Sequence, residues 1–210
     1  TFFLGVGVYR LAKRQALVRR AVVVENIGRV SCICSDKTGT LTEGRLQLTH
    51  RYPAPGLAQE RLLYLAAAAS RRETGDPMDL AILDVLGDSS IDEAVETFPF
   101  TEDRKRETRI VRQDGGLLSA VKGAPEKLFG MCTLADDERA AWLAQVDQLA
   151  GSGHKVIACA WRQLDAATWP GGEPDHGLQF AGLLAFEDPV RPGIQEAVQQ
   201  CHAGGIQVIM

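Results

Sequence analysis

The chain has 210 residues, of which 45% are hydrophobic, and its formal net charge is −4. This length and apolar content suffice for one large domain or two small domains with hydrophobic cores. The acidic balance gives no overall basic field, so we expect no nucleic-acid partner. The five cysteines lack paired zinc-ligand spacing, and their odd number, with no recognisable signal sequence, favours a reducing cytoplasm.

Residues 1–20 combine an apolar start with a basic continuation. The run 1–9 is apolar but much shorter than the roughly 20 residues of a membrane-spanning helix. Five basic residues follow before the first acidic residue, Glu25. An apolar end with a basic flank is typical of the cytoplasmic exit of a membrane helix. An amphipathic helix with a solvated basic face would have the same composition, so both interpretations stay open on these residues alone.

The two outer parts of the chain predict an α/β unit. Residues 30–35 are short, apolar and β-prone, which predicts a buried strand ending at Asp36. Near the other end, a helix is predicted at 194–203, followed by a second buried strand at 206–210. Functional sites of parallel α/β sheets form beyond the carboxyl ends of the strands. Asp36 therefore occupies a position where a site is expected.

Residues from about 45 to 186 predict a different architecture. Asp76 is the expected N-cap of a helix at 77–86. Because strands and helices do not alternate strictly, the pattern favours an α+β domain with an antiparallel sheet, inserted into the α/β unit. The other expected helices are 60–69, 125–131 and 137–150, and the expected strands are 95–100, 108–112, 117–121, 155–161 and 178–186.

The run from Asp36 to Thr42, Asp-Lys-Thr-Gly-Thr-Leu-Thr, carries the clearest chemistry. A carboxylate can attack a phosphoryl group that is held in line and whose charge is neutralised. Lys37 supplies a cation, Thr38 a hydroxyl, and Gly39 a backbone that can approach phosphate oxygens. The Asp36 carboxylate, together with Thr38, is also a candidate ligand of Mg²⁺, which prefers oxygen donors. We therefore predict that Asp36 accepts a phosphoryl group from ATP.

This run resembles the signature of P-type ATPases, the ion pumps that pass through an aspartyl phosphate. The resemblance implies a partial haloacid-dehalogenase-like phosphorylation domain with a Rossmann-type parallel sheet. Into it an α+β nucleotide-binding domain built on an antiparallel sheet would be inserted. The end of a membrane helix or stalk would then occupy 1–20, the phosphorylation domain 21–44 and 187–210, and the nucleotide-binding domain 45–186.

Thr38 separates this motif from that of related phosphatases. Aspartate-nucleophile phosphatases of the haloacid-dehalogenase type usually carry a second aspartate two residues after the nucleophile, as general acid and base. A threonine cannot deliver a proton in that way at neutral pH. We therefore expect the acyl phosphate to persist, which suits coupling to transport. A soluble phosphatase with an inserted cap domain remains the alternative enzyme, and a nucleotide-binding module without catalysis is the alternative from another class.

Two further motifs resemble the nucleotide-binding domain of the same family. In Lys-Gly-Ala-Pro-Glu, Lys122 would lie along the nucleotide and Gly123 would allow close backbone approach. In the segment 98–105, Phe100 would stack on adenine and Lys105 would assist it. The alternatives are an ordinary strand-to-helix turn for the first motif and a core aromatic for Phe100.

Other positions match the family less closely. Asp79 would receive the adenine amino group, although an exposed helix carboxylate is nearly as good an interpretation. Lys155 takes the place of a basic residue, usually arginine, that reaches the phosphates. Glu102 stands where the calcium-pump branch has arginine, so a positive charge is missing unless Arg104 or Arg106 replaces it.

Asp188 and Arg191 resemble the hinge between the two domains and would lie near the nucleotide. A helix N-cap is the alternative for Asp188. The Lys-Gly-Ala-Pro-Glu element, and the lack of a Ser-Glu-His-Pro-type motif, bring the chain closer to calcium and sodium/potassium pumps than to heavy-metal pumps.

The resemblance also implies cofactors and partners. These are ATP and Mg²⁺, together with transmembrane helices, an actuator domain and the rest of the phosphorylation domain in the same polypeptide. The parent would lie in the cell membrane with this region in the cytoplasm. Because family elements such as Thr-Gly-Asp are not found after 206–210, we expect a piece that binds nucleotide while Asp36 is silent.

Overall fold

The computed structural model describes residues 2–20, 22–87, 91–113 and 115–210. Residues 45–189 form one compact unit, here the large unit, and residues 1–44 with 190–210 form a second, the small unit. The large unit thus interrupts the small unit in the chain. Among the described residues, no helix is both long enough and apolar enough to cross a bilayer.

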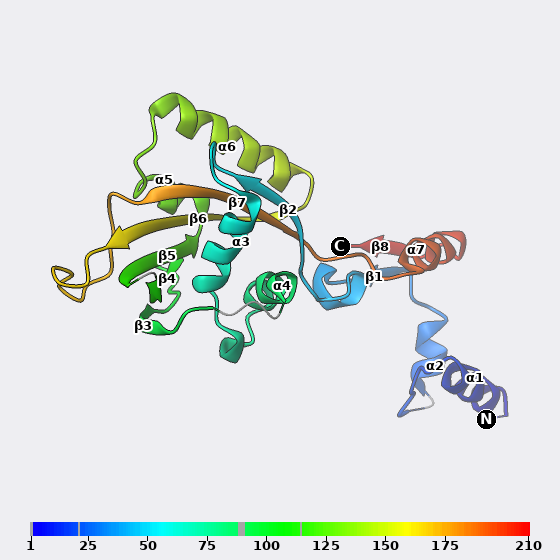
Figure 1. Ribbon diagram of the computed structural model, residues 1–210. Coiled ribbons are helices and arrows are strands. Elements are labelled where there is room, and N and C mark those ends of the chain that lie inside the picture. Colours follow the sequence, from blue (N-terminus) through cyan, green and yellow to red (C-terminus); the bar gives the residue numbers. More distant parts are fainter. Residues whose placement is uncertain (1, 21, 88–90, 114) are drawn as a thin grey trace. The chain divides into compact units, whose positions relative to one another are not determined.

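The large unit is built on a six-stranded antiparallel sheet with the strand order β2-β7-β6-β5-β4-β3 (Figure 1). This confirms the predicted α+β domain with an antiparallel sheet. The strands are β2 (Gln47–Pro53), β3 (Ala94–Phe98), β4 (Arg106–Gln113), β5 (Gly116–Gly123), β6 (Lys155–Leu164) and β7 (Gln179–Glu187).

The sequence pattern does not predict β2. This strand lies at the sheet edge and pairs only with β7, where polar side chains and Pro53 are tolerated. Its register also shifts between Leu48 and His50. Such a bulge interrupts the alternation of polar and apolar residues, which is the signal by which a strand is predicted.

Helices cover both faces of this sheet (Figure 1). Helices α3 (Gln59–Ala68) and α4 (Pro77–Leu86) pack on one face, and α5 (Pro125–Phe129) and α6 (Asp136–Gly151) on the other. Along β6, Ile157 and Cys159 belong to the first core, whereas Ala158 between them belongs to the second. Successive residues of a strand point to opposite faces, so two covered faces explain the continuous apolar runs of the central strands.

Helix α4 begins where its sequence predicts. The Asp76 side chain accepts hydrogen bonds from the backbone N–H groups of Met78 and Asp79 at 2.8 and 3.2 Å. Pro77 occupies the first turn, where its missing N–H costs nothing. The predicted bounds and the predicted N-cap are both confirmed. Asp79 is thereby fixed in the first turn of the helix, facing the site described below.

The small unit contains α1 (Phe2–Lys13), α2 (Val22–Ile27), the tight turn η1 (Lys37–Leu41) and α7 (Ile194–Ala203). The bounds of α7 agree with the predicted helix. Strands β1 (Cys32–Cys34) and β8 (Gln207–Ile209) form a parallel pair, as an α/β unit requires.

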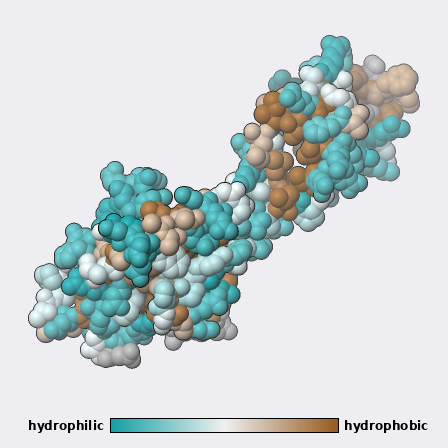
Figure 2. All heavy atoms as spheres, turned by 90° about the horizontal axis from the view of Figure 1, so that it is seen from above, coloured by the Kyte–Doolittle hydropathy of each residue, from teal (hydrophilic) through white to brown (hydrophobic). Residues whose placement is uncertain are grey.

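The prediction that these two strands are buried is wrong. All of β1 is exposed, including Cys32 and Cys34, and Ile33 and Ile209 keep 38% and 45% of their surface accessible. In the described part of the chain each of these strands has one neighbouring strand, so few side chains surround the pair. Figure 2 shows hydrophobic side chains at the surface of the small unit. Among its described residues, Thr42 alone is buried.

Candidate functional site

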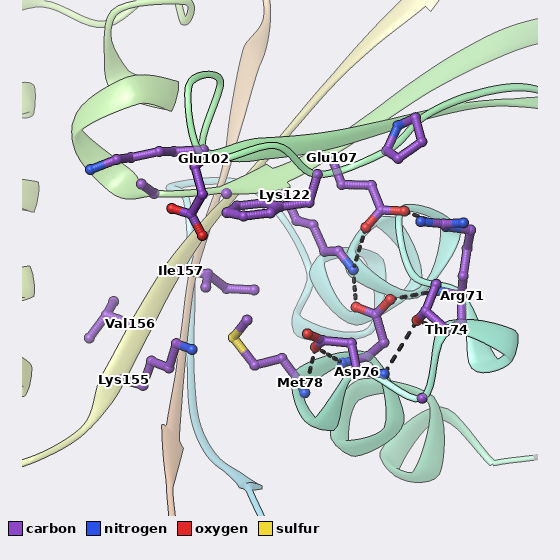
Figure 3. A pocket seen from close by; sticks show the side chains of 17 residues that line it. Arg71, Thr74, Asp76, Met78, Glu102, Glu107, Lys122, Lys155, Val156 and Ile157 are labelled. Atoms are coloured by element: carbon purple, nitrogen blue, oxygen red, sulfur yellow. Dashed lines mark hydrogen bonds and ion pairs between the residues drawn. The ribbon is translucent and has the colours of Figure 1, made fainter.

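A cavity of about 700 Å³ opens on the large unit (Figure 3). The start of α4, the loop 99–105 and the adjoining ends of β5 and β6 form its walls. Four separate segments of the chain contribute residues that the sequence predicted to bind nucleotide. These residues are Asp79, Phe100, Lys105, Lys122, Gly123 and Lys155.

Lys122 is the centre of a buried charge cluster in the wall of this cavity (Figure 3). Its Nζ donates to a carboxylate oxygen of Asp79 and to Oγ of Ser70, and it lies 3.5 Å from a carboxylate oxygen of Glu107. Arg71 completes the cluster, because its Nε donates to Glu107 at 2.5 Å and its backbone N–H donates to Asp79 at 2.9 Å. Two cations therefore neutralise two carboxylates, which buried charges require.

The sheet register explains half of this cluster. Glu107 of β4 stands directly opposite Lys122 of β5, and opposite charges in such cross-strand pairs attract. The sequence pattern did not identify Glu107, which lies one residue before the strand predicted at 108–112. Arg71 precedes the short helical turn η2 (Arg72–Thr74) and carries no local signal for its role.

Asp79 is not an exposed helix carboxylate, since only 2% of its surface is accessible. One of its oxygens accepts from Lys122 and the other from the backbone of Arg71. A ligand amino group would therefore meet a carboxylate that the protein already holds in place.

The loop 99–105 presents Phe100 at the edge of the cavity. Phe100 is 52% exposed, which excludes the alternative of a core aromatic. Lys105 has a positive φ of 51°, and its carbonyl accepts a hydrogen bond from the Ala124 N–H at 2.9 Å. A Cβ on Gly123 would lie only 2.8 Å from Cα of Arg106. Glycine is thus required at position 123 because the loop backbone passes directly against it.

Glu102 and Lys155 lie across the cavity from Arg71 (Figure 3). Glu102 stands in place of an arginine, and neither Arg104 nor Arg106 supplies the missing positive charge to the cavity. Both guanidinium groups bind Glu173, Arg104 at 2.7 Å and Arg106 at 3.0 Å. Both side chains are engaged there and do not line the cavity. No sequence pattern predicted a role for Glu173, which lies far away in the chain between β6 and β7.

In the small unit, the turn η1 folds back on itself after β1. The Thr42 hydroxyl donates to the Lys37 carbonyl at 3.1 Å and accepts from the Gly39 N–H at 3.2 Å. Gly39 has a φ of 78°, a conformation that favours glycine. Asp36, Lys37 and Thr38 are consequently displayed at the surface, beyond the carboxyl end of β1.

Arg191 holds this turn in place. Its Nε donates to the Thr42 carbonyl and its Nη2 to the Gly39 carbonyl, both at 2.8 Å. Its backbone N–H donates to the Leu41 carbonyl at 2.9 Å. These bonds give Arg191 a structural role beside Asp36, in the same unit, and it does not line the cavity.

Asp188, the other expected hinge residue, lies at the end of the large unit. Its carboxylate accepts the backbone N–H of Arg45 at 3.2 Å, which ties the two ends of that unit together. It does not cap α7, whose N-cap residue is Gly193.

The donor atoms near Asp36 fit Mg²⁺ in a limited way. In the part of the chain that the structure describes, no three His, Cys, Asp or Glu side chains gather as a metal site. Asp36 and Thr38 offer oxygen donors, which Mg²⁺ prefers, and this ion is often held by one or two carboxylates plus substrate phosphates and water. The arrangement fits an ion that arrives with a nucleotide.

Comparison with known proteins agrees with the motifs. The family model for the P-type ATPase cytoplasmic domain N matches residues 62–193. Calcium-transporting ATPase 1 of Bacillus cereus is 28% identical over 243 residues, covering 99% of this chain and 27% of that protein. A probable cation-transporting P-type ATPase of Mycoplasma genitalium is 30% identical over 230 residues, covering 98% of this chain and 25% of that protein.

The fold agrees as well. The crystal structure of a zinc-transporting PIB-type ATPase in its E2.Pi state superposes with a TM-score of 0.69 and 24% identity, covering 98% of this chain and 29% of that one. The chain spans about a quarter of the length of its curated relatives. Because the family model covers well over half of the chain, this chain belongs to the P-type ATPase family.

Proposed function

We propose that the large unit binds ATP in its cavity and that Asp36 accepts the terminal phosphoryl group in the whole protein. The observation that carries the proposal is the convergence of Phe100, Lys105, Lys122 and Lys155 around one cavity of about 700 Å³. A half-exposed aromatic ring offers a face on which adenine can stack. Lys105 and Lys155, which lie outside the neutral cluster around Lys122, provide positive charge that attracts phosphates.

The chemistry assigned to Asp36 is a transfer between oxygens. A carboxylate oxygen of Asp36 forms a bond to the γ-phosphorus as the bond from that phosphorus to the ADP oxygen breaks, which gives an acyl phosphate and ADP. The positive charge of Lys37 lowers the electrostatic repulsion between the Asp36 carboxylate and the γ-phosphate. Mg²⁺, held by Asp36 and Thr38, would supply further charge neutralisation on the phosphates. Thr38 cannot act as a general base for water, so the intermediate lasts.

The whole protein, in this proposal, is an ATP-driven cation pump. The relatives that match nearly the entire chain carry names of calcium-, sodium/potassium- and other cation-transporting ATPases, and they are about four times as long. The partners of this region would accordingly be other segments of one longer, membrane-embedded polypeptide. The region described would receive the nucleotide and form the phosphoenzyme.

A titration of the chain with ATP, followed by backbone amide chemical shifts, tests nucleotide binding. We expect weak binding, with a dissociation constant of roughly 0.1–5 mM, because few side chains contact the base and the phosphates stay largely solvated. Amides of the loop 99–105, Lys122 and Lys155 should shift most. Phe100→Ala should weaken binding, whereas Glu96→Gln, an exposed position on β3, should not. If the shifts avoid the cavity, the nucleotide assignment is wrong.

Phosphoryl transfer is tested in the full-length protein with ATP labelled at the γ-phosphate. We expect an acid-stable phosphoenzyme that hydroxylamine removes, because an acyl phosphate has this reactivity. Asp36→Asn should abolish the label while leaving ATP binding to the large unit intact. Labelling that survives in Asp36→Asn would assign the nucleophile to another residue.

A further inference from the structure

Glu173, in the large unit, accepts several hydrogen bonds and does not line the cavity. It lies in the connection between β6 and β7, and its side chain is 13% exposed. Its carboxylate accepts from Nη1 of Arg104 at 2.7 Å, from Nε and Nη2 of Arg106 at 3.0 and 3.1 Å, and from the Thr108 hydroxyl at 2.7 Å. Glu173 thereby links the connection between β6 and β7 to the end of the loop 99–105 and the start of β4. The linked residues are Arg104, Arg106 and Thr108.

Arg104 carries this attachment into the loop. Its Nε donates to the Thr101 hydroxyl at 3.2 Å, its Nη2 to the Pro99 carbonyl, and its Nη1 to Glu173. Each nitrogen of the guanidinium group thus has a hydrogen-bond acceptor, and the Arg104 side chain links Pro99 and Thr101 of the loop to Glu173. Phe100 sits between the two residues that Arg104 holds. The residues on both sides of Phe100 are therefore held by Arg104, whose remaining nitrogen donates to Glu173.

The other end of the loop is fixed by the backbone. The Lys105 carbonyl accepts the Ala124 N–H at 2.9 Å, and the Lys105 N–H donates to the Thr101 carbonyl at 2.7 Å. Hydrogen bonds thus hold the Pro99 end of the loop through Arg104 and the Lys105 end through the backbone. Within the connection that carries Glu173, Nε1 of Trp169 donates to the neighbouring Gly172 carbonyl at 3.0 Å.

The charge on Glu173 is stable in this setting. Its burial alone would raise the pKa of the carboxyl, but hydrogen bonds from Thr108, Arg106 and Arg104 outweigh burial and lower the pKa below its ordinary value. The carboxylate stays ionised at neutral pH, and both arginines keep a charged acceptor. Two cations against one carboxylate leave this group of side chains with one net positive charge.

We propose that Glu173 is a positioning residue for nucleotide binding, which holds the loop 99–105 through Arg104 so that Phe100 and Lys105 face the cavity. The inference rests on the proposed ATP site and adds to it a residue that no nucleotide touches. It predicts that loss of the Glu173 carboxylate lowers the population of the binding-competent loop. If that population falls to about a tenth, the apparent dissociation constant rises about 10-fold.

The test compares Glu173→Gln with the matched variant Glu96→Gln, which makes the same charge change at an exposed position on β3. ATP and adenosine are each titrated into both variants and into the unchanged chain. Removing one negative charge would by electrostatics alone tighten ATP and leave adenosine unchanged. Positioning predicts the opposite sign, a rise of about 10-fold in the dissociation constants of both ligands, since both stack on Phe100. Amide shifts in the ligand-free Glu173→Gln chain should be confined to residues 99–108 and the connection between β6 and β7.

Arg104→Ala tests the same link from the loop side, should Glu173→Gln fail to fold. This variant leaves Glu173 bound to Arg106 and Thr108, and it should weaken the binding of ATP and of adenosine as strongly as Glu173→Gln does. The double variant should lose little more than either single variant, because the two residues act in one chain of contacts. Unchanged affinity in Arg104→Ala or Glu173→Gln, with ATP binding intact in the parent chain, overturns the inference alone. If the parent chain binds neither ligand, the proposed function fails instead, and the ligand-free amide shifts still decide whether Glu173 holds the loop.

Discussion

The two units of this chain keep their shapes by different means. Every buried apolar side chain among the described residues belongs to the large unit, where two helical layers enclose a six-stranded sheet. The small unit has a single buried residue in its described part, Thr42, and its turn after Asp36 is held by hydrogen bonds from Thr42 and Arg191. A hydrophobic core resists local change, whereas a hydrogen-bonded turn opens more readily. Nucleotide recognition is thus proposed on the rigid unit and phosphoryl transfer on the adaptable one.

Cysteine alkylation should show this contrast most strongly. Burial raises the pKa of Cys132 and of Cys159 in the large unit to about 12, so both thiols stay protonated at pH 8. A thiol of this pKa holds about a thousandfold less thiolate than an ordinary cysteine, and only the thiolate reacts. The exposed Cys34 of the small unit should therefore be alkylated much faster than these two buried thiols, as followed by mass spectrometry. In denaturant the rates should become equal. Equal rates in the native chain would mean that the core of the large unit is open.

Core truncation should come next in size. Leu118→Ala removes a fully buried side chain of β5 and should lower the free energy of unfolding by about 2–5 kcal/mol. Ile33→Ala, at an exposed position of β1, should change it by less than about 1 kcal/mol. The three tryptophans, Trp142, Trp161 and Trp169, all lie in the large unit, so their fluorescence in a denaturant titration reports on that unit. A large shift caused by Ile33→Ala would show that the units unfold together.

Removal of the arginine that holds the turn should have a smaller, local effect. Arg191→Ala removes the side-chain hydrogen bonds to the carbonyls of Gly39 and Thr42, and hydrogen exchange of the turn amides should accelerate about 10-fold. Arg191→Lys keeps the charge but cannot reach both carbonyls in the same way, so an intermediate rate is expected. Exchange in the sheet of the large unit serves as the internal control and should not change. A global acceleration would assign Arg191 a role in overall stability.

The charge at Glu102 should have the smallest effect. Glu102→Gln removes a carboxylate from the cavity and should lower the dissociation constant for ATP about 2- to 5-fold at low salt, because the phosphates are no longer repelled. The gain should fade at about 1 M salt, where screening is nearly complete. Glu96→Gln provides the comparison. A gain that persists in high salt would point to a change of loop shape instead of charge.

The sequence predicted regular elements well wherever local signals determined them. Asp76 and Pro77 set the start of α4, and Gly87 its end. Burial in the small unit was predicted wrongly because an apolar run such as β1 indicates a strand but does not tell how many neighbours will cover it. The edge strand β2 was missed because its bulge hides the alternation.

The residues of the candidate site also fall into two groups, those predicted from the sequence and those found in the structure alone. Phe100 and Lys122 were identified by resemblance to a family, and the structure brings them to one cavity. Glu107, Arg71 and Glu173 were not identified, since each acts through a partner far away in the chain. Their roles follow from sheet register and from the course of long connections, which no local pattern encodes.

The pairing of β2 with β7 has a consequence for how the chain folds. Gln47 and Glu187 stand opposite each other, and Asp188 binds Arg45, so the large unit begins and ends at one place. In the unfolded chain, pairing β1 with β8 must close a loop of about 170 residues, and each halving of a loop lowers the entropic cost of closure by about 0.6 kcal/mol. Once the large unit has folded, the effective loop contains only the short segments outside it. Folding of the large unit therefore brings the two sequence segments of the small unit close together and lowers the entropic cost of pairing β1 with β8.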